Sequence, residues 1–144
     1  MTKASYSTKM TDKAAGRQVY CVVTDAYGKK VQSKTVTLGM SVAITQQPES
    51  VTVAEGETAK ITVKVIGDGL KYTWYVKNKG ASKFTKVSTT ASTYSVKMSS
   101  TTKDRQVYCV VKDKYGKSVK TDVVTLRMAA SITTQPKSVT AAKN

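Results

Sequence analysis

The chain has 144 residues and carries 24 Lys and Arg against 9 Asp and Glu, which gives a formal net charge of +15. It contains no His and only 2 Cys, so it lacks the Cys/His clusters of zinc sites and the commonest general base of enzymes. No apolar segment approaches the length needed to cross a membrane, and no nucleic-acid-binding motif accompanies the positive charge.

The sequence repeats itself with a period of 88 residues. Residues 17–23 (RQVYCVV) return unchanged as residues 105–111, and the alignment runs without a gap from Ser5 to Ala54. This period is longer than a solenoid turn and matches one small domain. The repeat therefore predicts a tandem array of small domains.

The register of the repeat divides the chain into three pieces. Residues 1–40 match the back of a unit and are expected to carry its last three strands. Residues 41–128 form one complete unit, and residues 129–144 match the first strand of a following one. The junctions between the pieces lack a linker rich in Pro, Gly and Ser, which predicts closely spaced neighbours in a stiff rod.

Apolar and polar residues alternate with a period of two along most of the complete unit. Its first segment contains Pro48, which suits an edge strand or a bulge. Alternating segments then follow in chain order at residues 61–65, 72–76, 94–98, 107–111 and 124–128. One apolar face per segment is typical of half-buried antiparallel strands. The pattern predicts an all-β, antiparallel sandwich of about seven strands.

The inward-facing positions of these segments give the predicted core. Trp74 is its largest member, and we expect it to bury the most apolar surface. Cys109 is interpreted as a small buried hydrophobe, with an intermolecular disulfide or a thioester-type reactive cysteine as alternatives. The predicted core consists of Val63, Tyr72, Trp74, Val96, Met98, Val107, Cys109, Val111 and Leu126.

Several motifs of the unit resemble those of immunoglobulin-like domains. Residues 56–63 (GETAKITV) look like strand B, and Trp74 lies 11 residues after Val63, where such domains place a core Trp on strand C. Residues 108–116 (YCVVKDKYG) have the Cys-to-Gly spacing of strand F and the F–G turn. With Trp74-Tyr75 and Lys79-Gly80, these motifs resemble the tandem immunoglobulin-like repeats of secreted and surface proteins of bacteria, especially Gram-positive ones. The resemblance implies an immunoglobulin-like β-sandwich that works outside the cell.

The unit departs from the immunoglobulin pattern at two positions. Val63 stands where strand B would carry a Cys, so the usual inter-sheet disulfide cannot form. Val107 stands two residues before Cys109, so the tyrosine corner is either absent or shifted to Tyr108. The stability of the fold should then depend on burial around Trp74.

No constellation of residues supports catalysis or metal binding. The acids mostly fall at turns or strand ends, where we expect Asp113 to hydrogen-bond within its own turn. Residues 67–69 (GDG) offer one carboxylate, whereas Ca²⁺ needs several oxygens. A Lys–Asn isopeptide bond is not supported, because Lys60, Lys64 and Lys97 face outward. We therefore expect no enzyme activity, no catalytic residue, no metal and no cofactor.

Basic and aromatic surface residues are the remaining candidates for ligand binding. Tyr75 and Tyr115 lie off the inward phase and could stack on sugar rings or anchor a protein partner. The competing interpretation is that the lysines keep the surface soluble, Tyr75 covers the outer sheet and Tyr115 packs in its turn. The densest basic run consists of Lys71, Lys77, Lys79, Lys83 and Lys86.

Three functional hypotheses follow from the sequence. The first is a structural spacer in the stalk of a multidomain bacterial surface protein, with neighbouring domains of the same chain as partners and the signal and anchor outside this segment. The second is a module that binds a glycan or an anionic cell-wall polymer. The third is a self-assembling fibre or phage subunit, a homo-oligomer whose partial repeats are completed by strand exchange. Specific nucleic-acid binding and membrane insertion are not expected.

Overall fold

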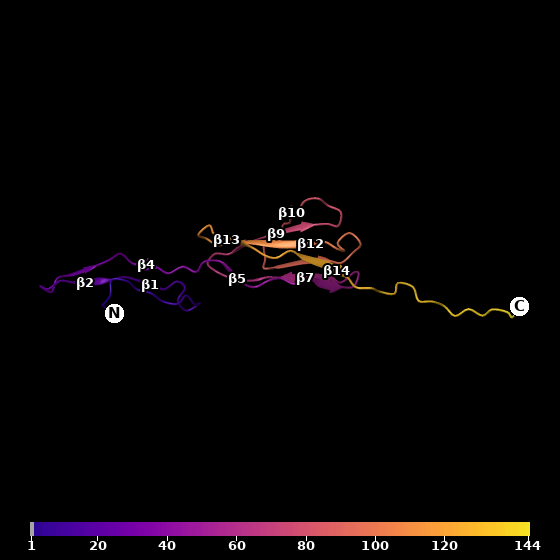
Figure 1. Cartoon of the computed structure of the whole chain (residues 1–144), viewed down its shortest axis with the longest axis horizontal. Helices are drawn as coiled ribbons and strands as arrows, with labels where there is room; N and C mark the ends of the chain where they lie inside the picture. The colour runs from indigo at the N-terminus through magenta and orange to yellow at the C-terminus, as the bar shows by residue number, and fades with distance from the viewer. Residues whose placement is uncertain (1) are drawn as a thin grey trace.

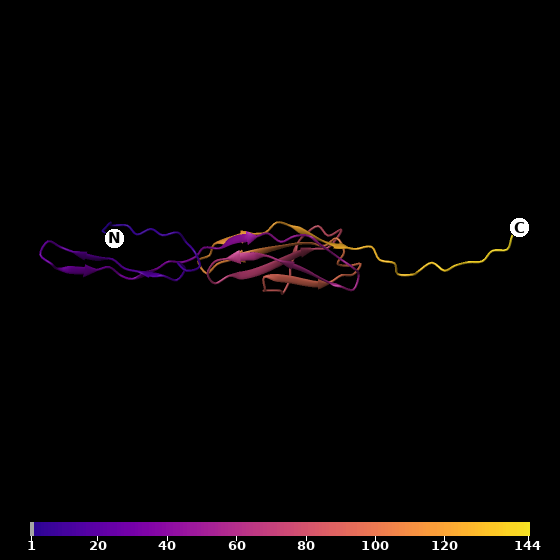
Figure 2. The ribbon, with the colours of Figure 1, turned by 90° about the horizontal axis from the view of Figure 1, so that it is seen from below.

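The computed structural model describes residues 2–144, which are drawn out along one long axis (Figure 1). An N-terminal hairpin comes first, a β-sandwich lies in the middle, and an extended tail follows it. The view turned by 90° shows the same elongation, with the hairpin and the tail at opposite ends of the sandwich (Figure 2). No helix in this described part of the chain is long and apolar enough to span a bilayer.

The N-terminal piece is a hairpin of two strands, each divided into two short segments. Its ladders pair β2 (Val22–Thr24) with β3 (Lys30–Gln32) and β1 (Gln18–Val19) with β4 (Val36–Thr37), both antiparallel. The turn between β2 and β3 forms because Asp25 Oδ1 accepts the backbone N–H groups of residues 27 and 29, each at 2.9 Å.

The third strand that we expected in residues 1–40 does not form. Residues 2–17 contain no strand. The equivalent strand of the complete unit is β11 (Thr93–Lys97), which pairs along its whole length with β7 (Thr58–Thr62). The hairpin has no counterpart of β7, and a strand is not formed without a partner for its backbone groups.

The larger sheet of the sandwich has the spatial order β10–β9–β12–β14–β6, with β13 also beside β12. The longest pairing joins the two central strands over seven residues and places Cys109 opposite Trp74. Only β6 and β14 run parallel within this sheet. The members are β6 (Val51–Val53), β9 (Lys71–Lys77), β10 (Thr85–Lys86), β12 (Gln106–Lys112), β13 (Ser118–Lys120) and β14 (Val124–Met128).

The opposite layer consists of two short ladders. In one, β11 pairs with β7, and in the other β5 (Ala43–Gln46) pairs with β8 (Lys64–Ile66). Only Val63 separates β7 from β8, so the two ladders share one continuous stretch of chain. The chain therefore enters the unit in one layer at β5 and crosses to the other layer at β6.

The core lies between the layers and centres on Trp74. This side chain is 0% exposed, and its Nε1 donates a hydrogen bond of 2.7 Å to the Ala91 carbonyl. Among the predicted core residues, Tyr72 and Val96 are half-buried and pack against the cluster. The fully buried ones are Val63, Trp74, Met98, Val107, Cys109, Val111 and Leu126. Val42, Ala59 and Ile61, which the prediction left out, are also buried there.

The tail over residues 129–144 contains no strand, so the first strand expected there is unpaired. Ile132 is 71% exposed and Val139 is 90% exposed. Their equivalents in the complete unit, Ile44 and Val51, pack against the core. The difference arises because β5 and β6 find their partners β8 and β14 within the same unit, whereas the tail lies beside no such strands.

The two thiols should differ in reactivity. Cys109 is completely buried, and this burial raises the pKa of its thiol to about 11, whereas Cys21 is exposed. We expect one thiol to react rapidly with a disulfide reagent in the native protein and two in denaturant. A bridged pair, or two equally fast native thiols, would contradict the buried placement of Cys109.

Candidate functional site: the joint before the complete unit

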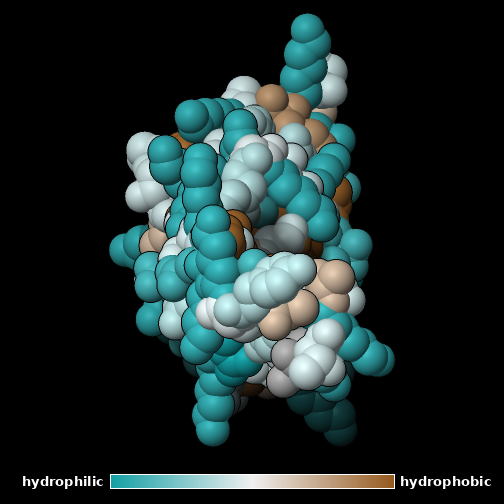
Figure 3. Space-filling view, turned by 90° about the vertical axis from the view of Figure 1, so that its left-hand side faces the viewer, coloured by the Kyte–Doolittle hydropathy of each residue, from teal (hydrophilic) through white to brown (hydrophobic). Residues whose placement is uncertain are grey.

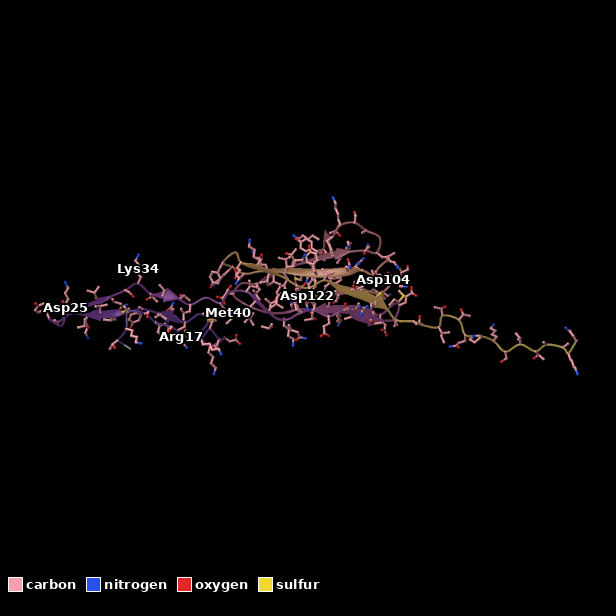
Figure 4. The ribbon with its side chains drawn as sticks, viewed as in Figure 1. Arg17, Asp25, Lys34, Met40, Asp104 and Asp122 are labelled. Atoms are coloured by element: carbon pink, nitrogen blue, oxygen red, sulfur yellow. The ribbon has the colours of Figure 1, made fainter. Side chains whose placement is uncertain are left out.

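Two aspartates bind the segment that joins the hairpin to the sandwich. Asp68 lies in the loop between β8 and β9, and Asp113 opens the turn between β12 and β13. Both loops are at the end of the sandwich that faces the hairpin. Met40, at the centre of the joining segment, is buried there, and its place between the two parts is labelled in Figure 4.

Asp68 makes a two-way contact with Met40. Its Oδ2 accepts the Met40 N–H at 2.9 Å, and its own N–H donates to the Met40 carbonyl at 3.0 Å. Gly67 permits this approach, because its φ is +142° and a Cβ there would lie 2.9 Å from the Val42 Cα. The loop therefore follows the joining segment at backbone contact distance.

The carboxylate of Asp113 accepts hydrogen bonds both from its own turn and from the joining segment. Its Oδ1 accepts the N–H groups of Tyr115 and Lys117, each at 2.9 Å, which forms the turn that the sequence predicted. Its Oδ2 accepts the N–H of Val42 at 3.0 Å, a contact that the sequence did not predict. Asp113 is only 4% exposed, so these bonds are largely shielded from water.

Tyr115 closes the joint over Gly39. Its hydroxyl donates to Asp68 Oδ2 at 2.7 Å, and a Cβ at position 39 would overlap that hydroxyl and the ring carbon beside it. Only glycine leaves this space free. Tyr115 therefore packs against the joint as well as within its own turn.

The pKa values at the joint reflect these bonds. The Tyr115 hydroxyl, with the Met40 N–H, holds the pKa of Asp68 below its ordinary 3.8. Burial acts to raise the pKa of Asp113, but the backbone N–H groups that it accepts outweigh burial and lower it. The pKa of Tyr115 is raised above 10.0, because its hydroxyl donates to a carboxylate.

The joint should open at both extremes of pH. Carboxyl groups with a lowered pKa stabilise the folded joint above pH 3.8, and that contribution is lost as pH falls through their folded values. The raised pKa of Tyr115 stabilises the joint below pH 10, and this contribution is lost above it. We expect the amide protons of Met40 and Val42 to lose protection from exchange below about pH 3.8 and above about pH 10. Unchanged protection in acid would contradict the role of the aspartates.

The hairpin carries the same pair of residues at its far tip. Asp25 and Tyr27 are the equivalents of Asp113 and Tyr115, and Asp25 is labelled at that tip in Figure 4. Asp25 forms the same turn, and Tyr27 is 96% exposed there. Position 127 differs, because Arg stands where Gly39 stands in the other copy. A Tyr could not close over Arg127 as Tyr115 closes over Gly39.

The outer face of the larger sheet carries an aromatic cluster covered by lysines. Tyr75 and Tyr108 stack at 5.0 Å between ring centroids, and Phe84 meets Tyr108 edge-on at 4.8 Å. The Lys120 ammonium lies 4.2 Å above the Tyr108 ring, and that of Lys77 lies 5.1 Å from the Phe84 ring. Tyr108 thus packs on this face and forms no tyrosine corner. We call these five residues the aromatic–lysine face.

The predicted basic run is only partly gathered on that face. Lys71, Lys77 and Lys86 lie on its strands β9 and β10. Lys79 instead forms an ion pair of 3.0 Å with Asp104, and Lys83 lies in the loop before β10. Sequence reasoning missed Phe84 and Lys120, because strand pairing between distant segments brings them beside Tyr108. The end-on view from the hairpin side is mostly hydrophilic (Figure 3).

Comparison with known proteins identifies the family and the fold of this chain. Residues 42–126 match the family model of the immunoglobulin I-set domain. The solved structure of DIP-gamma IG1+IG2 has a TM-score of 0.56 and 18% sequence identity to this chain. The match covers 86% of this chain but only 64% of the DIP-gamma chain. Immunoglobulin domains 1–5 of Sidekick-1 have a TM-score of 0.47 and 18% identity, and the match covers 77% of this chain and 24% of that one. A chimeric titin Z1Z2 has a TM-score of 0.46 and 14% identity, and the match covers 66% of this chain and 100% of that one. No curated protein sequence matches. The predicted all-β immunoglobulin-like fold is confirmed.

Proposed function

Because the chain belongs to the immunoglobulin I-set domain family, we propose that it is a non-catalytic structural spacer that sets the distance and angle between its neighbours in a multidomain extracellular protein. The proposal includes the finer expectation of a bacterial surface protein, which rests on the resemblance of its repeats to those of such proteins. Its partners are then the adjoining immunoglobulin-like domains of the same chain.

The observation that carries this proposal is the closed joint. A flexible linker would leave residues 39–42 in water, yet Met40 and Val42 are buried and each donates its N–H to an aspartate of the sandwich. These contacts fix the direction in which the chain enters the unit. A spacer needs this property, because a freely bending joint transmits neither distance nor orientation.

The strand order also suits a load applied along the chain. Force would enter the unit at β5, reach β6 next along the chain and leave at β14. Strands β6 and β14 pair in parallel, from Val51 beside Leu126 to Val53 beside Met128. Parallel strands pulled from opposite ends are loaded along their length, so their hydrogen bonds must break together rather than one by one.

Extension of single chains, held at the two ends, tests the spacer. We expect one sharp force peak for the sandwich, and a clearly lower peak for Val53→Pro, which removes one N–H of the parallel pair. Val139→Pro, at an unpaired site in the tail, is the control and should leave the peak unchanged. Smooth extension of the wild type without a peak would refute the proposal.

The aromatic–lysine face supports a second candidate function, the binding of an anionic glycan or cell-wall polymer. Aromatic rings flanked by ammonium groups offer stacking for sugars and charge for acidic substituents. Titration with a sulfated polysaccharide at low and high salt tests it. Lys77→Gln with Lys120→Gln should weaken binding, whereas Lys60→Gln with Lys97→Gln on the opposite sheet removes equal charge and should have less effect. Equal losses, or no binding at low salt, would reject this function.

A further inference from the structure

The tail carries the equivalent of strand β6, and the edge of the hairpin at residues 38–40 carries the equivalent of the part of β14 that pairs with β6. In that unit β6 lies beside β14, with the register Leu126↔Val51, Arg127↔Thr52 and Met128↔Val53. The repeat places Val139, Thr140 and Ala141 in the positions of β6. It places Leu38, Gly39 and Met40 in the positions of that part of β14.

The contacts around this pairing are made by residues that the tail retains. Gln47 Oε1 accepts the Asp122 N–H at 3.0 Å, and Ser50 Oγ accepts the Thr125 N–H at 3.0 Å. The tail carries the same two residue types as Gln135 and Ser138. The matching donors on the hairpin are the N–H groups of Lys34, labelled in Figure 4, and of Thr37.

The hairpin edge keeps the same backbone arrangement as the edge in the complete unit. Leu38 donates its N–H to Arg17 and accepts from Gly16, each at 2.9 Å, as Leu126 does with Arg105 and Asp104. Since N–H groups alternate in direction along a strand, those of Thr37 and Gly39 point away from β1. The next alternate residues, Met40 and Val42, bond to the sandwich, so Ser41 also points outward.

We propose that residues 135–141 of one chain lie parallel to residues 34–41 of a second copy of this chain, joining copies end to end. The tail cannot reach the hairpin of its own chain, because the two lie at opposite ends of the sandwich (Figures 1 and 2). The partner that we propose is the hairpin of a second copy. Val139, exposed in the structure, would cover part of the open apolar face of that copy's hairpin, as Val51 covers its own core.

Two proline variants of the tail give a matched test. In a parallel ladder a residue bonds to both neighbours of its partner, so Val53 provides the N–H to the Arg127 carbonyl and accepts from Ala129, at 2.8 Å. The equivalent of Val53 is Ala141, so Ala141→Pro removes a donor of the pairing. Thr140→Pro removes an N–H that points away from it. The tail is outside the sandwich, so both variants should fold like the wild type.

Sedimentation over a range of concentrations measures the assembly. We expect the average mass of the wild type to rise with concentration, whether as chains or as closed dimers, and Thr140→Pro to behave alike. Ala141→Pro and a chain ending at residue 128 should remain monomeric, and a peptide of residues 129–144 should shorten wild-type assemblies. A wild type that stays monomeric at its highest soluble concentration would overturn the proposal. Equal loss of assembly in both proline variants would overturn the register.

Discussion

Trp74→Ala should abolish the cooperative unfolding of the sandwich at ordinary temperatures. Truncation of a buried aromatic side chain costs about 3–5 kcal/mol, and a domain of this size has only about 5–15 kcal/mol in total. Here no inter-sheet disulfide supports the core, and the variant also leaves the Ala91 carbonyl without the indole N–H that it now accepts. Thermal and urea unfolding followed by circular dichroism would measure the loss.

Two controls separate the loss of Trp74 from general damage. Trp74→Phe keeps most of the buried apolar surface and should retain a cooperative transition at a lower melting temperature. Tyr27→Ala removes an aromatic side chain that is 96% exposed and should leave the melting temperature within a few degrees. If Trp74→Ala melted as close to the wild type as Tyr27→Ala does, Trp74 could not be the centre of the core.

Gly39→Ala should open the joint without unfolding the sandwich. A methyl group at position 39 overlaps the Tyr115 hydroxyl, so the ring must move and its hydrogen bond to Asp68 is lost. We expect faster amide exchange at Met40, and a broader distribution of angles between hairpin and sandwich in small-angle scattering, while the melting temperature of the sandwich stays near the wild-type value.

A double variant distinguishes this mechanism from a simple change in backbone freedom. Tyr115→Ala removes the ring that position 39 must avoid, so Gly39→Ala added to it should cause little further opening. The two single variants should therefore be non-additive. Additive opening in the double variant would show that Gly39→Ala does not act through the Tyr115 ring.

The sequence was sufficient for the sandwich, because a period of two can be read from each strand separately. Trp74 and Cys109 fall on inward positions, and the structure pairs them directly across β9 and β12. The same periodicity failed at the chain ends. Residues 5–10 alternate like β11, yet they lack a partner equivalent to β7, and pairing depends on another segment that a local pattern cannot reveal.

The joint was only partly predictable for a related reason. Asp113 forms a turn with its own neighbours, and this local bond was expected from its place before Tyr-Gly. Its bond to Val42 joins residues that are distant in sequence, as does the bond of Asp68 to Tyr115. The lone Gly39 gave no signal of its own, since the reason for a glycine there is the side chain of Tyr115. The ion pair of Lys79 with Asp104 and the contact of Lys120 with the Tyr108 ring also depend on how distant segments pair, which a local pattern does not reveal.

The Val at position 63 also determines how far a unit can lengthen once it yields to a pull. A covalent bridge from position 63 to Cys109 would hold the intervening segment closed, so about half of the unit could not extend. Without it, the whole period of 88 residues is released, which at full stretch amounts to about 300 Å. Under a sudden force each unit can therefore extend over its full length. Its refolding requires no disulfide chemistry.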